Sequence, residues 1–309
     1  MSQFPLEQRY VDLGVKAIDQ DDLDRALRYL NRAITLNKDF YLSYYNRGLV
    51  YDLMDRREDA LADYDRALAM QSNHLASQHN RAVILRELGR GEEAVAGLTE
   101  VLRFDPDNGD ALYNRGAALA DLGRFQDALA DYERAVRCDP GKLDARIAQG
   151  NAKLELGDVV GAIATADDVL AREPTSVEGH VLKGLSLADS GAPDRALEQF
   201  SDALRTTPDD HSALLHRGIV LLRLSRNEEA VSDLKHALKN HPDCDEAFYH
   251  LAIAYVQLGD QSSAIDALQM AIEIHPPRRV EAQKAAEFEV LRTEPRFKAV
   301  LAGKLGRRG

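Results

Sequence analysis

Small and apolar residues recur along this chain at intervals of 34 residues. Eight consecutive segments align without an insertion or deletion: 7–40, 41–74, 75–108, 109–142, 143–176, 177–210, 211–244 and 245–278. Alanine occupies the twentieth place of all eight segments, and the eighth place holds only Gly or Ala. Small residues at two fixed places of a helical segment indicate two helices packed closer than large side chains permit. The pattern therefore predicts one helical hairpin in each segment.

The fourth segment shows the expected hairpin. Its first helix is predicted over 111–122, its turn at Gly123 and its second helix over 125–137, which Pro140 ends. Proline recurs at this stop in the last six segments, because it cannot continue a helix.

The segments resemble the repeat of tetratricopeptide-repeat (TPR) proteins, which reads L-G-x2-Y, then A-x3-F, then P. The matching residues include Gly48 and Tyr51, Ala60 and Tyr64, Ala128 and Tyr132, and Ala196 and Phe200 before Pro208. The chain departs from the family pattern in having no Trp, and in carrying Arg or Lys instead of leucine at the seventh place of five repeats. The resemblance implies an all-α fold, a right-handed α-solenoid or superhelix of antiparallel helix pairs. It also implies a concave, peptide-binding groove lined by the first helix of each repeat.

Little of the chain lies outside the repeats. Residues 1–6 form an N-terminal extension, and residues 279–309 form a tail. A segment shorter than about 40 residues rarely folds alone, so neither is expected to be a catalytic domain. The tail is predicted to form capping helices on the last repeat. The first is expected to be one amphipathic helix and the second to follow Pro295, with apolar residues Val280, Ala285, Phe288, Leu291, Phe297 and Leu301.

Composition narrows the class of partner. The chain has 39 Lys and Arg against 51 Asp and Glu, a net charge of −12, which argues against nucleic acid and anionic membranes as partners. Cys138 and Cys244 lack a metal-ligand spacing, and no catalytic or cofactor-binding motif occurs. The chain also lacks a leader pattern and a run of 18 apolar residues. We therefore expect a cytoplasmic, non-enzymatic protein without a cofactor or a metal.

Two histidines share the sixth place of adjacent repeats, His216 and His250. Equivalent atoms of stacked repeats lie about 8–10 Å apart, too far for one zinc ion with ligands at about 2 Å. These histidines are therefore expected to line the groove or to pack.

The candidate binding face lies on the first helices. The second, sixth, ninth and thirteenth places fall within a stripe of about 60°, and the fifth place lies beside it. At the fifth and sixth places, repeats two to four read Tyr45-Asn46, His79-Asn80 and Tyr113-Asn114, and the last repeat has Tyr249 at its fifth place. A row of amides offers donors and acceptors to an extended peptide, and tyrosine provides contact area. The alternative that these asparagines serve packing stays open.

Carboxylates follow the same face. Asp110 and Asp144 take the second place, and Asp121 and Glu155 take the thirteenth. They favour a basic or extended protein or peptide ligand. The fifth place never carries Lys, which argues against the carboxylate clamp of chaperone-binding members of the family. The main functional hypothesis is an adaptor that binds a peptide or protein segment in the groove. The alternative is a self-assembling structural scaffold, and the oligomeric state stays open.

Charged residues also predict packing. Arg47, Arg115 and Arg217 take the seventh place, and only their repeats have Asp at the twenty-third place: Asp63, Asp131 and Asp233. Because an arginine at a usually apolar place needs a partner, we predict an ion pair in each of these repeats, while Arg81, which faces Gly97, needs another acceptor.

The sequence also predicts which repeat is the weakest and how the basic end of the tail behaves. The fifth repeat carries Ala166 where other repeats have larger apolar residues, so it should be the weakest. The tail carries a net charge of +4, and its basic end, 304–309, is expected to be frayed and solvated rather than to compete for the acidic groove.

Overall fold

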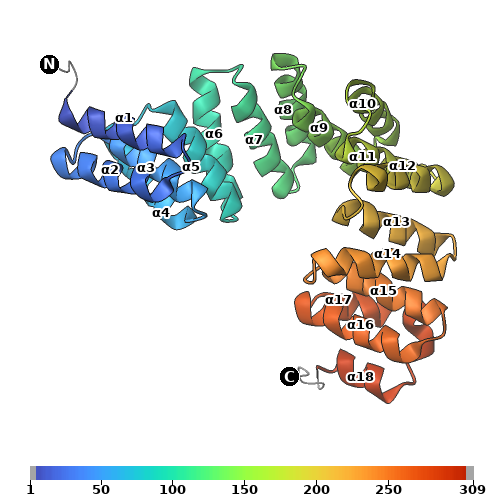
Figure 1. Cartoon of the computed structure of the whole chain (residues 1–309). Coiled ribbons are helices and arrows are strands. Elements are labelled where there is room, and N and C mark those ends of the chain that lie inside the picture. Colours follow the sequence, from blue (N-terminus) through green and yellow to red (C-terminus); the bar gives the residue numbers. More distant parts are fainter. Residues whose placement is uncertain (1–4, 304–309) are drawn as a thin grey trace. The chain divides into compact units, whose positions relative to one another are not determined.

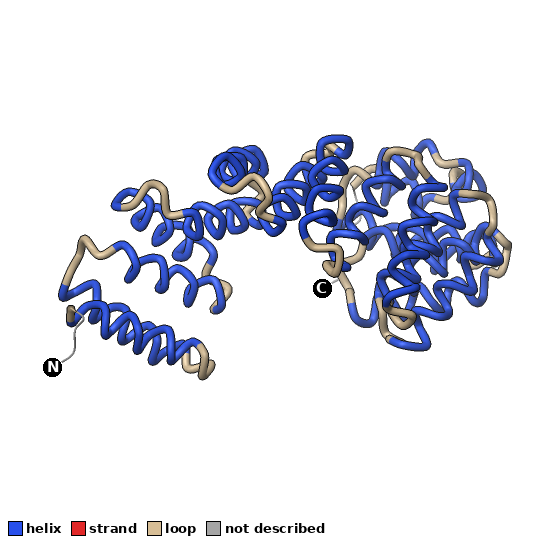
Figure 2. The backbone as a smooth tube through the Cα atoms, turned by 90° about the horizontal axis from the view of Figure 1, so that it is seen from above, coloured by secondary structure: helices blue, strands red, loops and turns tan. Residues whose placement is uncertain are grey.

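The computed structural model describes residues 5–303, so the basic end at 304–309 lies outside the described residues. Within 5–303 the chain consists of helices joined by short loops, with no strand (Figure 2). The chain divides into two compact units, Met1–Leu156 and Gly157–Gly309. This boundary falls between the two helices of the fifth repeat, a division that the regular spacing of the sequence does not indicate.

The first unit contains the four leading helix pairs and the first helix of the fifth repeat. Each helix packs against the next one along the chain, so the pairs stack in sequence order (Figure 1). The helices are α1 Leu6–Ile18, α2 Leu23–Leu36, α3 Tyr41–Leu53, α4 Arg57–Met70, α5 Leu75–Glu87, α6 Gly91–Phe104, α7 Gly109–Asp121, α8 Phe125–Cys138 and α9 Leu143–Glu155.

The second unit begins with the second helix of the fifth repeat and shows the same order of packing. Its helices are α10 Val159–Arg172, α11 Val177–Asp189, α12 Pro193–Thr206, α13 His211–Arg223, α14 Asn227–Asn240, α15 Asp245–Gln257, α16 Gln261–Ile274 and α17 Arg278–Lys284, followed by the 3-10 helix η1 Ala286–Leu291 and by α18 Pro295–Leu301. The predicted all-α solenoid of antiparallel helix pairs is confirmed in both units.

Small residues hold the two helices of a repeat together, as the spacing predicted. All eight alanines at the twentieth place are 0% exposed. The glycine at the eighth place of the first helix leaves room for a large side chain of the second helix. A Cβ added to Gly48 would lie 2.7 Å from Cε1 of Tyr64, and one added to Gly116 would lie 2.7 Å from Cε1 of Tyr132. The aromatic ring of the second helix therefore lies directly on the backbone of the first.

The tail caps the last repeat, but it does not form the single leading helix that the apolar pattern predicted. Ala285 has φ −66° and ψ 129°, an extended conformation that ends α17 before η1 begins. This break turns the apolar side of η1 inward, so that Phe288 and Leu291 are fully buried, while Val280 on α17 is 50% exposed. Phe297 on α18 is also buried and contacts Phe288, with ring centroids 6.2 Å apart.

Candidate functional site

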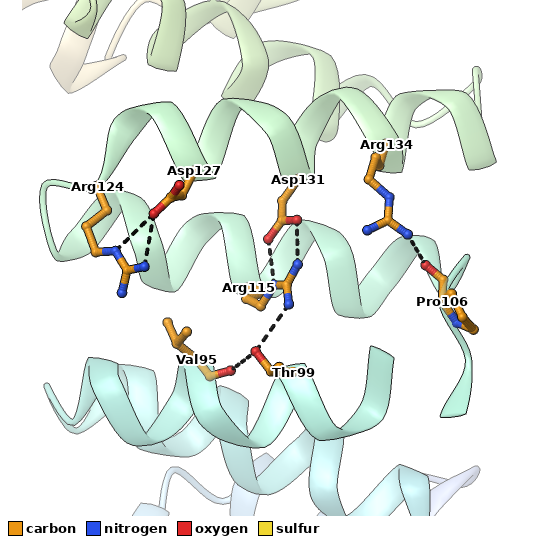
Figure 3. Close-up of polar contacts among 8 residues, drawn as sticks. All are labelled: Val95, Thr99, Pro106, Arg115, Arg124, Asp127, Asp131 and Arg134. Atoms are coloured by element: carbon orange, nitrogen blue, oxygen red, sulfur yellow. Dashed lines mark hydrogen bonds and ion pairs between the residues drawn. The ribbon is translucent and has the colours of Figure 1, made fainter. Parts of the chain in front are cut away.

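Ion pairs inside the repeats position the first helices. Arg115 on α7 donates from Nε and Nη2 to both carboxylate oxygens of Asp131 on α8, each at 2.7 Å (Figure 3). The same two-bond geometry joins Arg47 to Asp63 and Arg217 to Asp233. The three predicted ion pairs are therefore confirmed.

Each of these arginines also reaches the preceding repeat. Nη1 of Arg115 donates to Oγ1 of Thr99 at 3.1 Å, and Thr99 in turn donates to the carbonyl oxygen of Val95 (Figure 3). Arg47 and Arg217 make the corresponding bonds to Asn31 and Ser201. One guanidinium thus links three helices, which sets the register between neighbouring repeats on which the candidate face depends.

Two tyrosine pairs mark the candidate face of the first unit. Tyr45 lies against Tyr64, with ring centroids 6.2 Å apart, and Tyr113 lies against Tyr132 at 5.9 Å. In each pair the tyrosine of the first helix stays partly exposed, whereas that of the second helix is buried over the eighth-place glycine. The inner ring therefore holds the outer ring in place, and the outer ring offers a rigid surface.

The three predicted asparagines have different surroundings. Asn46 is buried, and its Nδ2 donates to the carbonyl oxygen of Leu42, one turn earlier on the same helix, at 2.7 Å. Asn114 lies 3.0 Å from Nε2 of His79 on the neighbouring first helix. Burial lowers the pKa of His79, so its ring is neutral near pH 7 and can accept this bond.

Asn80 lies beside the pair Tyr45 and Tyr64. Burial raises the pKa of the Tyr45 hydroxyl, and the Asn80 amide partly opposes this effect. Asn80 and Asn114 remain partly exposed, whereas Asn46 is turned into its own helix. The three amides are therefore not an even row.

A basic or imidazole side chain from the last place of the repeat covers each of the three predicted tyrosine anchors. The ring of His74 meets that of Tyr45 at 4.8 Å, nearly edge-on. Nζ of Lys142 lies 4.9 Å from the ring centre of Tyr113. In the second unit, Cζ of Arg278 lies 5.0 Å from the ring centre of Tyr249. These partners were not predicted. The sequence does contain a signal for them, because only the three repeats with Tyr at the fifth place carry His, Lys or Arg at the last place. The other five repeats have Phe, Asn, Ser, Asp or Cys there.

The predicted carboxylates fall into two groups. Asp110 forms an ion pair with Lys142, which lowers the pKa of Asp110, and Asp121 accepts from Nε of Arg86 at 2.6 Å. Asp144 and Glu155, on α9, are exposed. Half of this set is thus neutralised within the chain, and the acidity of the face is lower than the residue types alone indicate.

In the second unit, Tyr249 lies beside the cap. Its ring meets that of Phe288 edge-on at 5.6 Å, so part of its surface is already used. His216 and His250 are largely buried, and burial lowers the pKa of both; that of His250 falls to about 4. Within residues 5–303 no three His, Cys, Asp or Glu side chains are grouped as they would be around a metal ion, and no helix has the length and apolar character needed to cross a membrane.

Comparisons with known proteins agree with this architecture. The tetratricopeptide-repeat family model matches residues 11–74, 54–108 and 79–142, and the model of the N-terminal TPR repeats region of Psidin matches residues 144–276. No curated protein sequence matches the chain.

Several solved structures are similar to the chain. A tetratricopeptide-repeat protein from Parabacteroides merdae has a TM-score of 0.69 and 20% identity, over 80% of this chain and 98% of that one. Yeast Tom70 has a TM-score of 0.65 and 18% identity, over 98% of this chain and 68% of that one. YrrB, described as a TPR protein with an unusual peptide-binding site, has a TM-score of 0.51 and 26% identity, over 60% of this chain and 95% of that one. The 34-residue helix pairs, the stacking order and these matches together make the chain a member of the tetratricopeptide-repeat family.

Proposed function

We propose that this protein is a non-enzymatic, cytoplasmic adaptor that binds an extended segment of a partner protein on the first-helix face of its first unit. The observation that carries the proposal is the pair of outer tyrosines, Tyr45 and Tyr113, two repeats apart on α3 and α7. Both are partly exposed and both are backed by a buried tyrosine. Rigid aromatic rings give contact area at a low cost in side-chain entropy, which suits peptide binding.

Amides beside these rings support an extended ligand. Asn80 lies next to Tyr45, and Asn114 follows Tyr113 in sequence and contacts His79. The distance between neighbouring first helices is about 8–10 Å, which about three residues of an extended peptide span. A ligand that touches both tyrosines therefore needs about five or six residues between its anchor points.

Peptide selection tests this proposal. A library of random 12-residue peptides should be displayed and selected on the full chain, and the selected peptides measured by calorimetry. The double variant Tyr45→Ala/Tyr113→Ala should weaken their binding at least tenfold. Tyr29→Ala, on a second helix, is the matched control and should leave binding unchanged. Equal binding to the parent and to the double variant would rule out this face.

One observation favours self-assembly as a second candidate function. The second helices α2, α4 and α6 end in Leu36, Met70 and Phe104, which are 39%, 38% and 54% exposed. A row of apolar side chains in consecutive repeats suits an interface between copies. If this row assembles the protein, sedimentation should show a mass that rises with concentration, and Phe104→Glu should return the protein to a monomer. A monomer at all concentrations would exclude this function.

A further inference from the structure

The last repeat departs from the packing of the others at its seventh place. In the seventh repeat Arg217 stands there and pairs with Asp233, at the twenty-third place of the same repeat. The last repeat holds Leu251 and Ala267 at these two places. A leucine and an alanine occupy less space than an arginine and an aspartate, and a hollow lies beside them.

This hollow is apolar and open to solvent. Its volume is about 250 Å³, and pockets for drug-sized ligands measure about 300–1,000 Å³, so the hollow suits a single large apolar side chain. Leu251 and Ala267 are buried, whereas Met270 is 40% exposed. The apolar residues that line the hollow are Phe248, Leu251, Tyr255, Ala267 and Met270.

The hollow lies on the opposite side of α15 from the candidate peptide face. Its α15 residues take the fourth, seventh and eleventh places, whereas the candidate face uses the second, sixth, ninth and thirteenth. At about 100° per residue, these two sets of places point to opposite sides of a helix. A ligand in the hollow would therefore bind separately from one on the candidate face, so the inference goes beyond the proposed function.

A lysine without an ion pair stands beside the hollow. Nζ of Lys235 on α14 lies 5.4 Å from the ring centre of Tyr255, and Lys235 forms no ion pair within the described part of the chain. The same twenty-fifth place holds Asp65 and Asp167 in repeats two and five, where each pairs with the seventh-place cation of the next repeat. Lys235 reverses this charge, and Leu251 in the next repeat cannot pair with it.

The carboxylates near Lys235 already have partners. Asp266, which also borders the hollow, pairs with Arg296 of the cap. Asp260 accepts from the backbone N–H of Ser263 at 3.1 Å and so caps α16. Hydrogen bonds from Ser263 lower the pKa of Asp260 most, and the charge of Lys235 lowers it further. Lys235 is therefore available to the carboxylate of a ligand.

A second lysine extends the positive edge of the hollow. Lys239 follows Lys235 by one turn of α14, and residues four apart lie on the same face of a helix. Lys239 is exposed and forms no ion pair with another described residue. In the preceding repeat the equivalent residue, Arg205, lines the corresponding groove but pairs with Asp202. The two lysines thus provide unpaired positive charge beside an apolar hollow, in a chain whose net charge is −12.

We propose that this hollow is a second protein-binding site, for a partner segment with one large apolar residue, Leu, Met or Phe, and an Asp or Glu within two residues of it. The apolar side chain lies over Leu251 and Ala267, and removing its surface from water provides the affinity. The carboxylate pairs with Lys235 or Lys239, which selects against basic segments. An extended segment rises about 3.3 Å per residue, so a carboxylate one or two residues away reaches an ammonium group 5.4 Å from the Tyr255 ring.

Peptide selection can test this site independently of the first one. The random 12-residue library should be selected on the full chain with Tyr45→Ala/Tyr113→Ala, which disables the candidate face of the first unit. We expect enrichment of Leu, Met or Phe with Asp or Glu within two residues. Replacing that Asp or Glu by Asn or Gln should weaken binding at least tenfold in calorimetry.

Variants of the hollow's positive edge provide the matched comparison. Lys235→Gln/Lys239→Gln should weaken the selected peptides at least tenfold, because it removes the charges that pair with their carboxylate. The control Lys16→Gln/Lys284→Gln removes the same two charges from exposed sites elsewhere and should leave binding unchanged.

A further variant tests the hollow itself. Ala267→Leu places a larger apolar side chain in it, so this variant should melt no lower than the parent and should weaken the selected peptides at least tenfold. Equal binding to Ala267→Leu or to Lys235→Gln/Lys239→Gln would overturn the inference, and so would the enrichment of no peptide. If Ala267→Leu instead converts a self-associating parent into a monomer in sedimentation, a second copy occupies the hollow and the inference is wrong. These results leave the candidate face of the first unit to its own test.

Discussion

Arg81 on α5 donates from Nε to Oδ1 of Asp65 on α4, sixteen residues earlier, at 2.5 Å. Arg115, at the same place one repeat later, pairs instead with Asp131 of its own repeat. Lys183, at the same place of the sixth repeat, pairs in the same way as Arg81: its partner is Asp167 on the second helix of the preceding repeat, at 2.8 Å. Each of the five cations at the seventh place therefore meets one carboxylate, at the twenty-third place of its own repeat or at the twenty-fifth place of the preceding repeat.

This alternation predicts that a carboxylate can be moved between the two places. Asp131→Asn should lower the free energy of unfolding by about 2 kcal/mol, because it leaves the largely buried guanidinium of Arg115 with a weaker partner. Adding Thr99→Asp should restore about 1 kcal/mol, since that side chain would then stand where Asp65 stands relative to Arg81. Urea denaturation of the three proteins measures both changes. No recovery in the double variant would show that the two places are not equivalent.

The like charges of Asp52, in the second repeat, and Glu87, in the third, should cost stability. Because the pKa of Asp52 is raised in the folded state, its ionised form is destabilising above that pKa. Asp52→Asn should therefore raise the free energy of unfolding at pH 7. The gain should fade as the pH falls toward about 4, where the unfolded carboxyl group also takes up a proton. Denaturation across this range, with Glu58→Gln as control, checks the sign. A loss of stability at pH 7 would mean that Asp52 is a structural carboxylate.

Buried imidazoles should make the second unit sensitive to acid. The pKa of His250 is lowered to about 4 by burial, then by the charges of Arg278 and Arg223, and Glu287 opposes these effects. A lowered histidine pKa contributes stability that is complete above the unfolded value of about 6.5 and is lost as the pH falls to about 4.

For His250 this loss is on the order of 3 kcal/mol. His250→Gln should therefore flatten the dependence of stability on pH between those two values, and the exposed His275→Gln should not. Identical curves for the parent and His250→Gln would show that this imidazole is accessible to protons in the folded state.

The three asparagines on the first helices should have different roles in stability and in peptide binding. Replacing Asn46, Asn80 and Asn114 together by Ala should weaken a selected peptide while the helical content stays the same, each lost hydrogen bond counting about 0.5–1.5 kcal/mol. Because Asn46 bonds to its own helix, Asn46→Ala alone should lower stability and leave the affinity unchanged. Calorimetry and circular dichroism of the single and triple variants measure both effects. A triple variant that binds as tightly as the parent would assign all three amides to packing.

Opening should begin in the fifth repeat. The boundary between the two compact units falls after Leu156, and Ala166 on α10 stands where other repeats carry larger apolar residues. An array of repeats is stabilised by nearest-neighbour packing, so a repeat with a small core residue contributes least. Amide hydrogen exchange should be faster in 143–176 than in 41–74. Slower exchange in 143–176 would contradict this prediction.

The repeated spacing was sufficient to predict the helix pairs, because the residues that pack within a repeat lie close in sequence and recur in the same places. Ala128, Gly116 and Tyr132 belong to one hairpin, and so do Arg115 and Asp131. The break at Ala285 was not predicted, because the apolar periodicity continues through it and only packing on the last repeat selects the extended conformation.

What the sequence alone determined is thus the fold: eight short-range helical hairpins whose Ala and Gly residues permit only close antiparallel pairs. What only the tertiary structure decided is which side chains meet between hairpins. Arg86 reaches Asp121, thirty-five residues away, and Asn114 reaches His79 over the same separation. These contacts depend on the register between stacked repeats, which no single repeat contains. The same stacking brings the like charges of Asp52 and Glu87 near each other, thirty-five residues apart in the sequence.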